Sequence, residues 1–270
     1  MKIGNRDFDV NNHTYIMGIL NVTPDSFSDG GSHNSVDKAL KRTEQMISEG
    51  ASIIDVGGES TRPNYTMISE DEEIERTAPV IEQIKQHFDI PVSIDTYKHR
   101  VAAAAAASGA DMINDIWGLQ YDSGEMAKLI ADSGCTCCLM HNHRTTEYRH
   151  FMADMITQMK QMVSAALSAG IPQDKIVIDP GIGFGKTYEM NLSVLKHLDE
   201  VCRIGYPVLL GCSRKSVIGN TLHLPVSERV EGTAVTTVQA VLSGCAFVRV
   251  HDIKENERTI RMARAILEAE

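Results

Sequence analysis

The chain has 270 residues, 43% of them hydrophobic, and its formal net charge at pH 7 is −10. This length and apolar content suit one α/β barrel domain over residues 1–270, and the negative charge argues against general binding of nucleic acid or of an anionic membrane surface. No apolar run approaches the roughly 20 residues needed to cross a bilayer, and the N-terminal residues lack the apolar core of a secretion signal, so we expect a cytoplasmic protein.

Short apolar runs alternate along the chain with helical patterns. Each run has the length of a buried strand, and each is followed by a polar turn and an amphipathic segment. The runs are 15–20, 52–55, 92–94, 112–113, 136–140, 176–178, 207–210 and 247–250. The helical patterns are 36–47, a segment from 69, one that ends near 108, 124–133, 151–169, a segment from about 188, 227–244 and a last segment that includes 260–267.

Local signals refine four of these helices. Ser69 begins a capping-box pattern, and Pro79 is expected to kink or restart the same helix. Ser227 is expected to cap the helix that Gly244 ends. The apolar face of the last helix is expected to include Leu267.

Eight strand–helix units in this order predict a parallel sheet, and at this chain length a closed (β/α)8 TIM barrel. The structural alternative is an open, doubly wound sheet. Residues 1–14 precede the first unit, and we expect them to form a small hairpin across the bottom of the barrel.

Polar residues occur at the end of every expected strand. One Asp or Asn there commonly caps a turn, but a full set is better explained by a shared pocket at the C-terminal face of the barrel. Acceptors and an amide on Asp95, Asn114 and Asp179 suit a flat nitrogen heterocycle. Arg249 and His251, two residues apart on one strand, suit an anion. The full set is Asn21, Asp55, Asp95, Asn114, Asp115, His141, Asp179, Ser213, Arg214, Lys215, Arg249 and His251.

The segment Gly-Ile-Gly-Phe-Gly-Lys-Thr at 181–187 resembles a phosphate-binding P-loop. That motif requires a glycine five positions before the glycine of Gly-Lys, and Pro180 stands there instead. The segment is therefore interpreted as a glycine-rich turn that lets a ligand approach the backbone.

Several segments together resemble the dihydropteroate synthases. The most specific are the first loop, Met-Gly-Ile-Leu-Asn-Val-Thr-Pro-Asp-Ser-Phe-Ser-Asp-Gly-Gly at 17–31, the second loop, Asp-Val-Gly-Gly-Glu-Ser-Thr-Arg-Pro at 55–63, and Ser-Arg-Lys-Ser at 213–216. Shorter motifs in the family's order lie at 93–96, 113–115, 139–141, 178–181 and 249–252. The resemblance covers nearly the whole chain.

The resemblance implies a transferase of folate biosynthesis that joins a pterin diphosphate to p-aminobenzoate, requires Mg2+, is a sulfonamide target and forms a homodimer. The implied pterin-binding residues are Asp95, Asn114, Ile116, Met140, Asp179 and Lys215. The implied diphosphate-binding residues are Asn21, Arg249 and His251, and Asn21 would also meet Mg2+. The implied p-aminobenzoate residues are Phe27, Thr61, Arg62, Pro63, Phe184 and Ser216. The groups implied in catalysis are Asp95, Lys215 and Arg249.

The sequence departs from the family's usual pattern at Asn64, at Trp117 and at 142–144. These changes bear on loop mobility and on inhibitor sensitivity rather than on the reaction. Loops 23–33 and 59–69 are rich in small and polar residues, and we expect them to be more mobile than the barrel.

Two other functions are weighed against this one. A pterin-dependent methyltransferase that acts on a corrinoid protein would share the barrel, but it would not be expected to carry the first loop or Ser-Arg-Lys-Ser. A non-catalytic pterin-binding paralogue would be expected to lose loop or anion-binding residues, which are present here.

Overall fold

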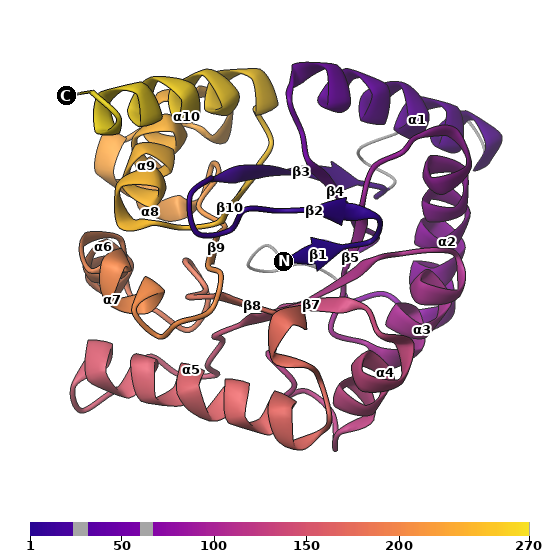
Figure 1. Ribbon diagram of the computed structural model, residues 1–270, viewed down its shortest axis with the longest axis horizontal. Coiled ribbons are helices and arrows are strands. Elements are labelled where there is room, and N and C mark those ends of the chain that lie inside the picture. The colour runs from indigo at the N-terminus through magenta and orange to yellow at the C-terminus, as the bar shows by residue number, and fades with distance from the viewer. Residues whose placement is uncertain (24–31, 60–66, 270) are drawn as a thin grey trace.

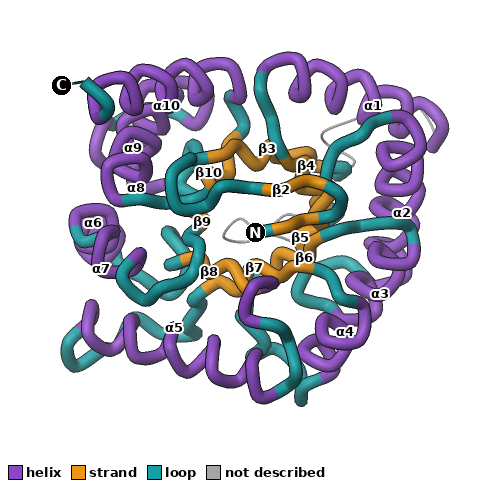
Figure 2. The backbone as a smooth tube through the Cα atoms, viewed as in Figure 1, coloured by secondary structure: helices purple, strands orange, loops and turns teal. Residues whose placement is uncertain are grey.

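The computed structural model describes residues 1–23, 32–59 and 67–269. Its eight-stranded parallel sheet has the strand order β8-β7-β6-β5-β4-β3-β10-β9, with helices around the outside (Figure 1; Figure 2). A bridge between Ile178 and Val208 joins the two ends of this order and closes the barrel. The expected (β/α)8 barrel is therefore confirmed, and the open-sheet alternative is wrong.

Every expected apolar run overlaps a barrel strand. The strands are β3 (Tyr15–Asn21), β4 (Ile53–Gly57), β5 (Val92–Asp95), β6 (Met112–Asp115), β7 (Thr136–Met140), β8 (Ile176–Asp179), β9 (Leu209–Leu210) and β10 (Phe247–Val250). The helices are α1 (Ser32–Glu49), α2 (Glu70–His87), α3 (His99–Ala107), α4 (Glu125–Ser133), α5 (Phe151–Ser168), α6 (Tyr188–Lys196), α7 (Leu198–Cys202), α8 (Ser216–Leu222), α9 (Val230–Ser243) and α10 (Ile253–Leu267). No helix in these described ranges is long and apolar enough to cross a membrane.

Helix α2 begins as the sequence predicts, because the Ser69 hydroxyl accepts a hydrogen bond from the Glu72 N–H at 3.2 Å. It then continues through Pro79 as one helix, so the expected restart is wrong. Proline removes one backbone hydrogen bond from a helix interior. Val80 and Ile81 follow it directly and are buried in the core, which holds the second half of the helix against the barrel.

One expectation near the C-terminus is also wrong. Ser227 does not cap a helix: it lies inside a short 3-10 turn (Val226–Glu228), and α9 begins after Arg229, whose guanidinium donates to the Leu224 carbonyl and so fixes the turn. Leu267 lies on the same face of α10 as the buried Ile260, but it is the last residue of the helix and is 54% exposed.

The N-terminal residues close the bottom of the barrel, as expected. Strands β1 (Lys2–Ile3) and β2 (Arg6–Asp7) form an antiparallel hairpin that crosses the barrel in the view of Figure 1. Its Ile3 side chain and the following Phe8 are buried, and the Phe8 ring meets Tyr15 edge to face at a centroid distance of 4.9 Å. The inner barrel residues in this cluster are Met17, Ile53, Met112, Cys138, Val177, Leu209 and Phe247.

Candidate active site

Alternation along the strands decides which polar side chains face the barrel interior, because side chains two residues apart lie on the same face. Phe247 belongs to the bottom layer, so Arg249 also faces inward, at the C-terminal end of β10. The same spacing relates Val177 to Asp179 on β8. It brings the following residues together at the C-terminal opening of the barrel, which we call the mouth: Asn21, Asp55, Asp95, Asn114, Met140, Asp179 and Arg249.

Arg249 lies at the centre of a buried network in this mouth. Its Nε donates to Asp55 Oδ2 at 2.5 Å, and its terminal nitrogen donates to Asp95 Oδ2 at 2.6 Å. The Asn114 amide also donates to Asp55 Oδ2, at 3.3 Å. Asp55 is fully buried, and no role was assigned to it from the sequence. Its inward position on β4 was the signal that could have identified it.

The carboxylates of Asp55 and Asp95 each bind Arg249 through only one of their two oxygens. Oδ1 of Asp55 and Oδ1 of Asp95 are buried and accept no hydrogen bond from the described residues. Burial raises the pKa of Asp95 to about 7, which the Arg249 guanidinium opposes and the Asp55 carboxylate reinforces. The mouth therefore offers two buried acceptor oxygens, and one of them belongs to Asp95, whose pKa lies near neutral pH.

Asp179 and Lys215 face each other on the opposite side of the mouth. A Cβ at Gly211 would lie at ordinary contact distance from both groups, 3.4 Å from Asp179 Oδ2 and 3.8 Å from Lys215 Nζ, so both side chains border this glycine. Burial raises the pKa of Asp179, which the Lys215 charge opposes. Burial also lowers the pKa of Lys215, which the Asp179 charge opposes.

An apolar cluster forms the wall beside Lys215. Tyr97, Ile116 and Met140 are buried together, and Trp117 and Phe184 pack against them. The Lys215 ammonium lies 4.7 Å from the centroid of the Phe184 ring, a cation–π distance. The structure thus brings Ile116 and Met140, assigned to the pterin, together with Phe184, assigned to p-aminobenzoate, and places all three beside Lys215.

Two departures from the family pattern meet at the edge of this wall. The Arg144 guanidinium lies 5.7 Å from the centroid of the Trp117 ring. The Asn142 amide donates to the Ile116 carbonyl at 3.0 Å. Unusual residues after β6 and after β7 therefore pack on one another.

The predicted anion-binding residues lie on the first and last strands. A Cβ at Gly57 would lie 3.5 Å from Asn21 Oδ1 and 3.8 Å from Asp95 Oδ2, so Asn21 and Asp95 flank this glycine. His251 follows Arg249 by two residues, and its Nδ1 lies 3.0 Å from the Ser213 hydroxyl.

The predicted p-aminobenzoate residues are only partly described. Ser216 is exposed and is the first residue of α8. The remaining members lie outside the described residues: Phe27, Thr61, Arg62 and Pro63. Asn64 and most of loops 23–33 and 59–69 lie outside them as well.

Two polar strand-end residues do not face the mouth. Asp115 accepts hydrogen bonds from the N–H groups of Trp117 and Leu119, and so forms a turn. His141 follows the inward-facing Met140, and its Nε2 lies 2.7 Å from the Gln158 side-chain oxygen on α5. Alternation separates these residues from the candidate site.

A buried ion network that the sequence did not predict lies next to the site. Lys98 Nζ donates to Glu59 Oε2 at 2.7 Å and to Glu73 Oε2 at 2.8 Å. It also donates to the Ile68 carbonyl at 2.9 Å, and the Tyr97 hydroxyl donates to Glu59 Oε1. The network connects the described residues on both sides of 60–66. A Lys three residues after β5 and a Glu inside α2 were the only signals in the sequence.

The expected Mg2+ depends on a sparse donor set. Within the described ranges, no group of three His, Cys, Asp or Glu residues could hold a metal ion. Asn21 contributes one amide oxygen at the mouth. Mg2+ commonly binds proteins through one or two oxygens and keeps water and substrate phosphates as its other ligands, so this donor set fits a substrate-carried ion.

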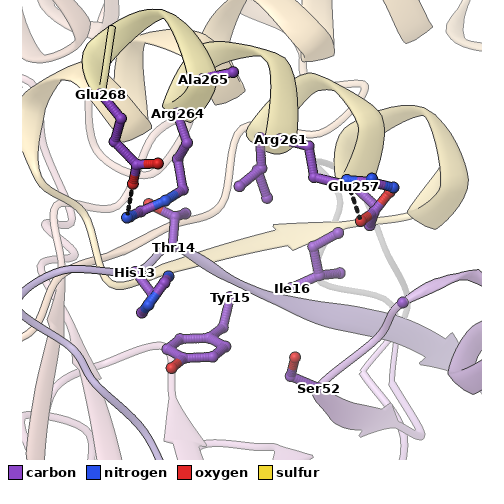
Figure 3. A pocket seen from close by; sticks show the side chains of 12 residues that line it. His13, Thr14, Tyr15, Ile16, Ser52, Glu257, Arg261, Arg264, Ala265 and Glu268 are labelled. Atoms are coloured by element: carbon purple, nitrogen blue, oxygen red, sulfur yellow. Dashed lines mark hydrogen bonds and ion pairs between the residues drawn. The ribbon is translucent and has the colours of Figure 1, made fainter. Parts of the chain in front are cut away.

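A cavity of about 420 Å3 lies elsewhere, between the start of β3 and α10 (Figure 3). Figure 3 shows Arg261 paired with Glu257 and Arg264 paired with Glu268 along its wall. The cavity is at the N-terminal end of β3, whereas the buried polar network is at the C-terminal ends of the strands. In a barrel of this type the chemistry belongs to the C-terminal face.

A family model described as pterin binding enzyme matches residues 17–251. Because this match covers most of the chain, the chain belongs to the pterin-binding enzyme family.

Its relatives within that family are dihydropteroate synthases. The chain is 54% identical over 268 residues to the dihydropteroate synthase of Clostridium beijerinckii, with 99% of each chain covered. The structure of the Clostridium difficile enzyme, determined in the presence of pteroic acid, has 48% identity and a TM-score of 0.94, with 97% of this chain and 100% of that chain covered. The Xanthomonas albilineans enzyme with 4-aminobenzoic acid has 38% identity and a TM-score of 0.91, with 96% and 95% covered. These findings confirm the resemblance and count against the corrinoid methyltransferase.

We predict that Lys98→Met destabilises the protein strongly, because it leaves Glu59 and Glu73 buried without a cation. Breaking a buried ion pair in this way typically costs about 3–5 kcal/mol. Denaturant unfolding of both proteins would measure the loss. Lys128→Met is the matched control, since Lys128 pairs with Asp132 on the surface and its loss should change stability far less. Equal losses in the two variants would contradict the prediction.

Proposed function

We propose that the chain condenses 6-hydroxymethyl-7,8-dihydropterin diphosphate with p-aminobenzoate, giving 7,8-dihydropteroate and diphosphate. The observation that carries this proposal is the convergence of Asp95, Asn114, Asp179 and Lys215 in one barrel mouth beside an apolar wall. A flat heterocycle with several N–H donors matches such a mouth. Pteroic acid, the ligand of one related structure, contains such a heterocycle, and 4-aminobenzoic acid, the ligand of another, is the second substrate of the proposed reaction.

The pterin would lie between the polar network and the apolar wall. The free Oδ1 of Asp95 and the carboxylate of Asp179 would accept its amino and ring N–H groups. The Asn114 amide and the Lys215 ammonium would meet its acceptors. Ile116 and Met140 would contact the ring face.

In the reaction, the bond between the pterin methylene carbon and the diphosphate oxygen breaks, and the electron pair leaves with the diphosphate. The amine nitrogen of p-aminobenzoate then bonds to that carbon and loses a proton. Arg249, with His251, would stabilise the leaving charge, and the Asp95 carboxylate would offset positive charge on the pterin. Asp55 would keep the guanidinium of Arg249 directed into the mouth.

Asn21 would hold Mg2+ through its amide oxygen, next to the diphosphate. When bound, the ion would neutralise charge on the departing diphosphate. Phe184 and Ser216, together with residues 27 and 61–63 outside the described ranges, would receive p-aminobenzoate, with the Phe184 ring against the ligand ring.

We also infer that the protein acts as a single-domain cytoplasmic homodimer. Supporting the dimer, five large apolar side chains on α9 and α10 are more than half exposed, which is a common mark of an interface. They are Val235, Leu242, Met262, Ile266 and Leu267.

Diphosphate release is the direct test of the reaction. We expect release only when both substrates and Mg2+ are present. Asp179→Ala should abolish pterin binding in calorimetric titration while the protein stays folded, and Asp179→Asn, which keeps an acceptor for the Gly181 N–H, should bind weakly. Release without p-aminobenzoate would indicate a hydrolase, and pterin binding without any release would indicate the non-catalytic paralogue.

We predict that turnover rises with pH through about 7, because the Asp95 carboxyl must ionise to offset positive charge on the pterin. With a pKa of about 7, its ionised fraction grows from about one tenth at pH 6 to about nine tenths at pH 8. The ratio of wild-type to Asp95→Asn kcat/KM isolates this step. A ratio independent of pH would remove Asp95 from this role.

The same pKa has a consequence for stability. A carboxyl whose pKa is higher in the folded state stabilises the fold fully below its unfolded value, near 3.8, and loses that contribution as the pH rises through about 7. Unfolding experiments on the wild type and Asp95→Asn between pH 4 and 8 should therefore show the wild type losing relative stability over that interval.

We predict that the wild type sediments as a dimer and that Val235→Glu shifts it to the monomer, since a carboxylate would be buried in the interface. Leu192→Glu is the matched control, because Leu192 is an exposed apolar residue on α6. Sedimentation of the wild type as a monomer at micromolar concentration would contradict the dimer.

A further inference from the structure

We propose that Lys186 is a positioning residue that holds the 181–186 segment in shape and, through Phe184, forms the p-aminobenzoate side of the site. This inference rests on the proposed function. Lys186 has no P-loop role, because the segment lacks the glycine that this motif requires, and none of the roles assigned above uses it.

The Lys186 ammonium is enclosed by acceptors. Nζ lies 2.9 Å from the Phe184 carbonyl oxygen, 3.0 Å from the Gly181 carbonyl oxygen and 3.0 Å from His141 Nδ1. The residue is 9% exposed. The His141 carbonyl oxygen is a fourth acceptor, at 3.3 Å. An ammonium has three N–H donors, so these acceptors use all of them. Lys186 therefore has no donor left for a substrate and acts through its own loop.

His141 is fixed in the form that accepts from Lys186. Its Nε2 lies 2.7 Å from the side-chain oxygen of Gln158, which can only accept, so Nε2 carries the proton and Nδ1 presents its lone pair. Burial, together with the Lys186 charge, lowers the pKa of His141 to about 4, so the ring is neutral at physiological pH. His141, at the end of β7, therefore joins α5 through Gln158 and the 181–186 segment through Lys186.

The acceptors that surround Nζ, which we call the cage, also determine whether Lys186 is charged. Burial lowers its pKa to about 7, and Asp179 opposes this. A neutral amine has only two N–H groups and cannot satisfy three acceptors, so the cage itself favours the ammonium. The cation would be retained because the loop is folded around it.

Two glycines of this segment, Gly181 and Gly185, accommodate protein backbone. Gly181 has φ +69°, and a Cβ there would lie 2.0 Å from the His141 carbonyl oxygen. Gly185 has φ +56°, and a Cβ there would lie 2.3 Å from the His143 carbonyl oxygen. The segment therefore lies directly on residues 141–143, and Lys186 joins the two.

The other side of the segment faces the candidate site. The Ile182 carbonyl accepts from Lys215 Nζ at 2.6 Å, and the Phe184 ring lies against the same ammonium. Loss of the Lys186 ammonium would remove the donor to the partly buried Phe184 carbonyl and one of the two donors to the Gly181 carbonyl, which would still accept from the Phe184 N–H. Unpaired buried acceptors are costly, so the segment would rearrange and carry the Phe184 ring with it.

The test is Lys186→Met, which keeps the length of the side chain and removes its donors. We expect the KM for p-aminobenzoate to rise about tenfold or more, with a smaller change in kcat. Lys196→Met, on the exposed side of α6, is the matched control and should leave both constants unchanged. A lower melting temperature with an unchanged KM would mean that Lys186 is merely structural, and would overturn the proposal.

A double-mutant cycle separates action through Phe184 from a general effect. If Lys186 acts through that ring, Lys186→Met should add almost nothing to the KM increase of Phe184→Ala. Independent, multiplying effects would contradict the mechanism. If Lys186→Met does not fold, Gln158→Leu disturbs the cage from its far end, through the His141 tautomer, and should raise the same KM.

Hydrogen exchange tests the cage without turnover. The amides of Gly183 and Phe184 bond within this region, to Asn191 Oδ1 at 2.7 Å and to the Gly181 carbonyl at 3.1 Å. They should exchange faster in Lys186→Met than in the wild type. Equal exchange rates would contradict the role proposed for Lys186. A wild type without diphosphate release would instead refute the proposed function, so the two failures are distinguishable.

Discussion

The guanidinium of Arg249 is a permanent positive charge at the buried end of a barrel strand, and much of the site follows from the need to compensate it. Two carboxylates, from β4 and β5, bind it, and the Asn114 amide binds one of them. Burial raises the pKa of Asp95 to about 7, and the neighbouring Asp55 carboxylate acts in the same direction. The mouth's ability to bind an anion, to accept hydrogen bonds and to bind a proton at Asp95 therefore depends on one residue, Arg249.

The opposite side of the mouth uses lysines in a different way. Lys215 and Lys186 each donate to backbone carbonyls of the same short segment, from opposite faces. Lys215 interacts electrostatically with Asp179 and lies over the Phe184 ring, whereas Lys186 is enclosed. One cation therefore faces the candidate ligand, and the other gives a glycine-rich segment, which has little conformational preference of its own, a single shape.

The barrel and most of the candidate site could be predicted because their signals are local. A run of apolar residues followed by Asp179 or Asn114 marks a strand and its C-terminal end without knowledge of the rest of the chain. The partnership of Asp55 with Arg249 could not be predicted, because it joins residues 194 positions apart. The Lys98 network depends in the same way on tertiary contacts, and the exposure of Leu267 depends on where the neighbouring structure ends.

The alternation of side chains along the strands limits the sequence changes that such a protein can accumulate in evolution. Insertion or deletion of one residue within a barrel strand would turn the side chains beyond it to the opposite face, so that Asp179 would exchange places with Ile178. The mouth would lose a carboxylate, and the helix layer would acquire a buried charge. Length changes are thus confined to the loops, while the strands of related chains can diverge only by substitution.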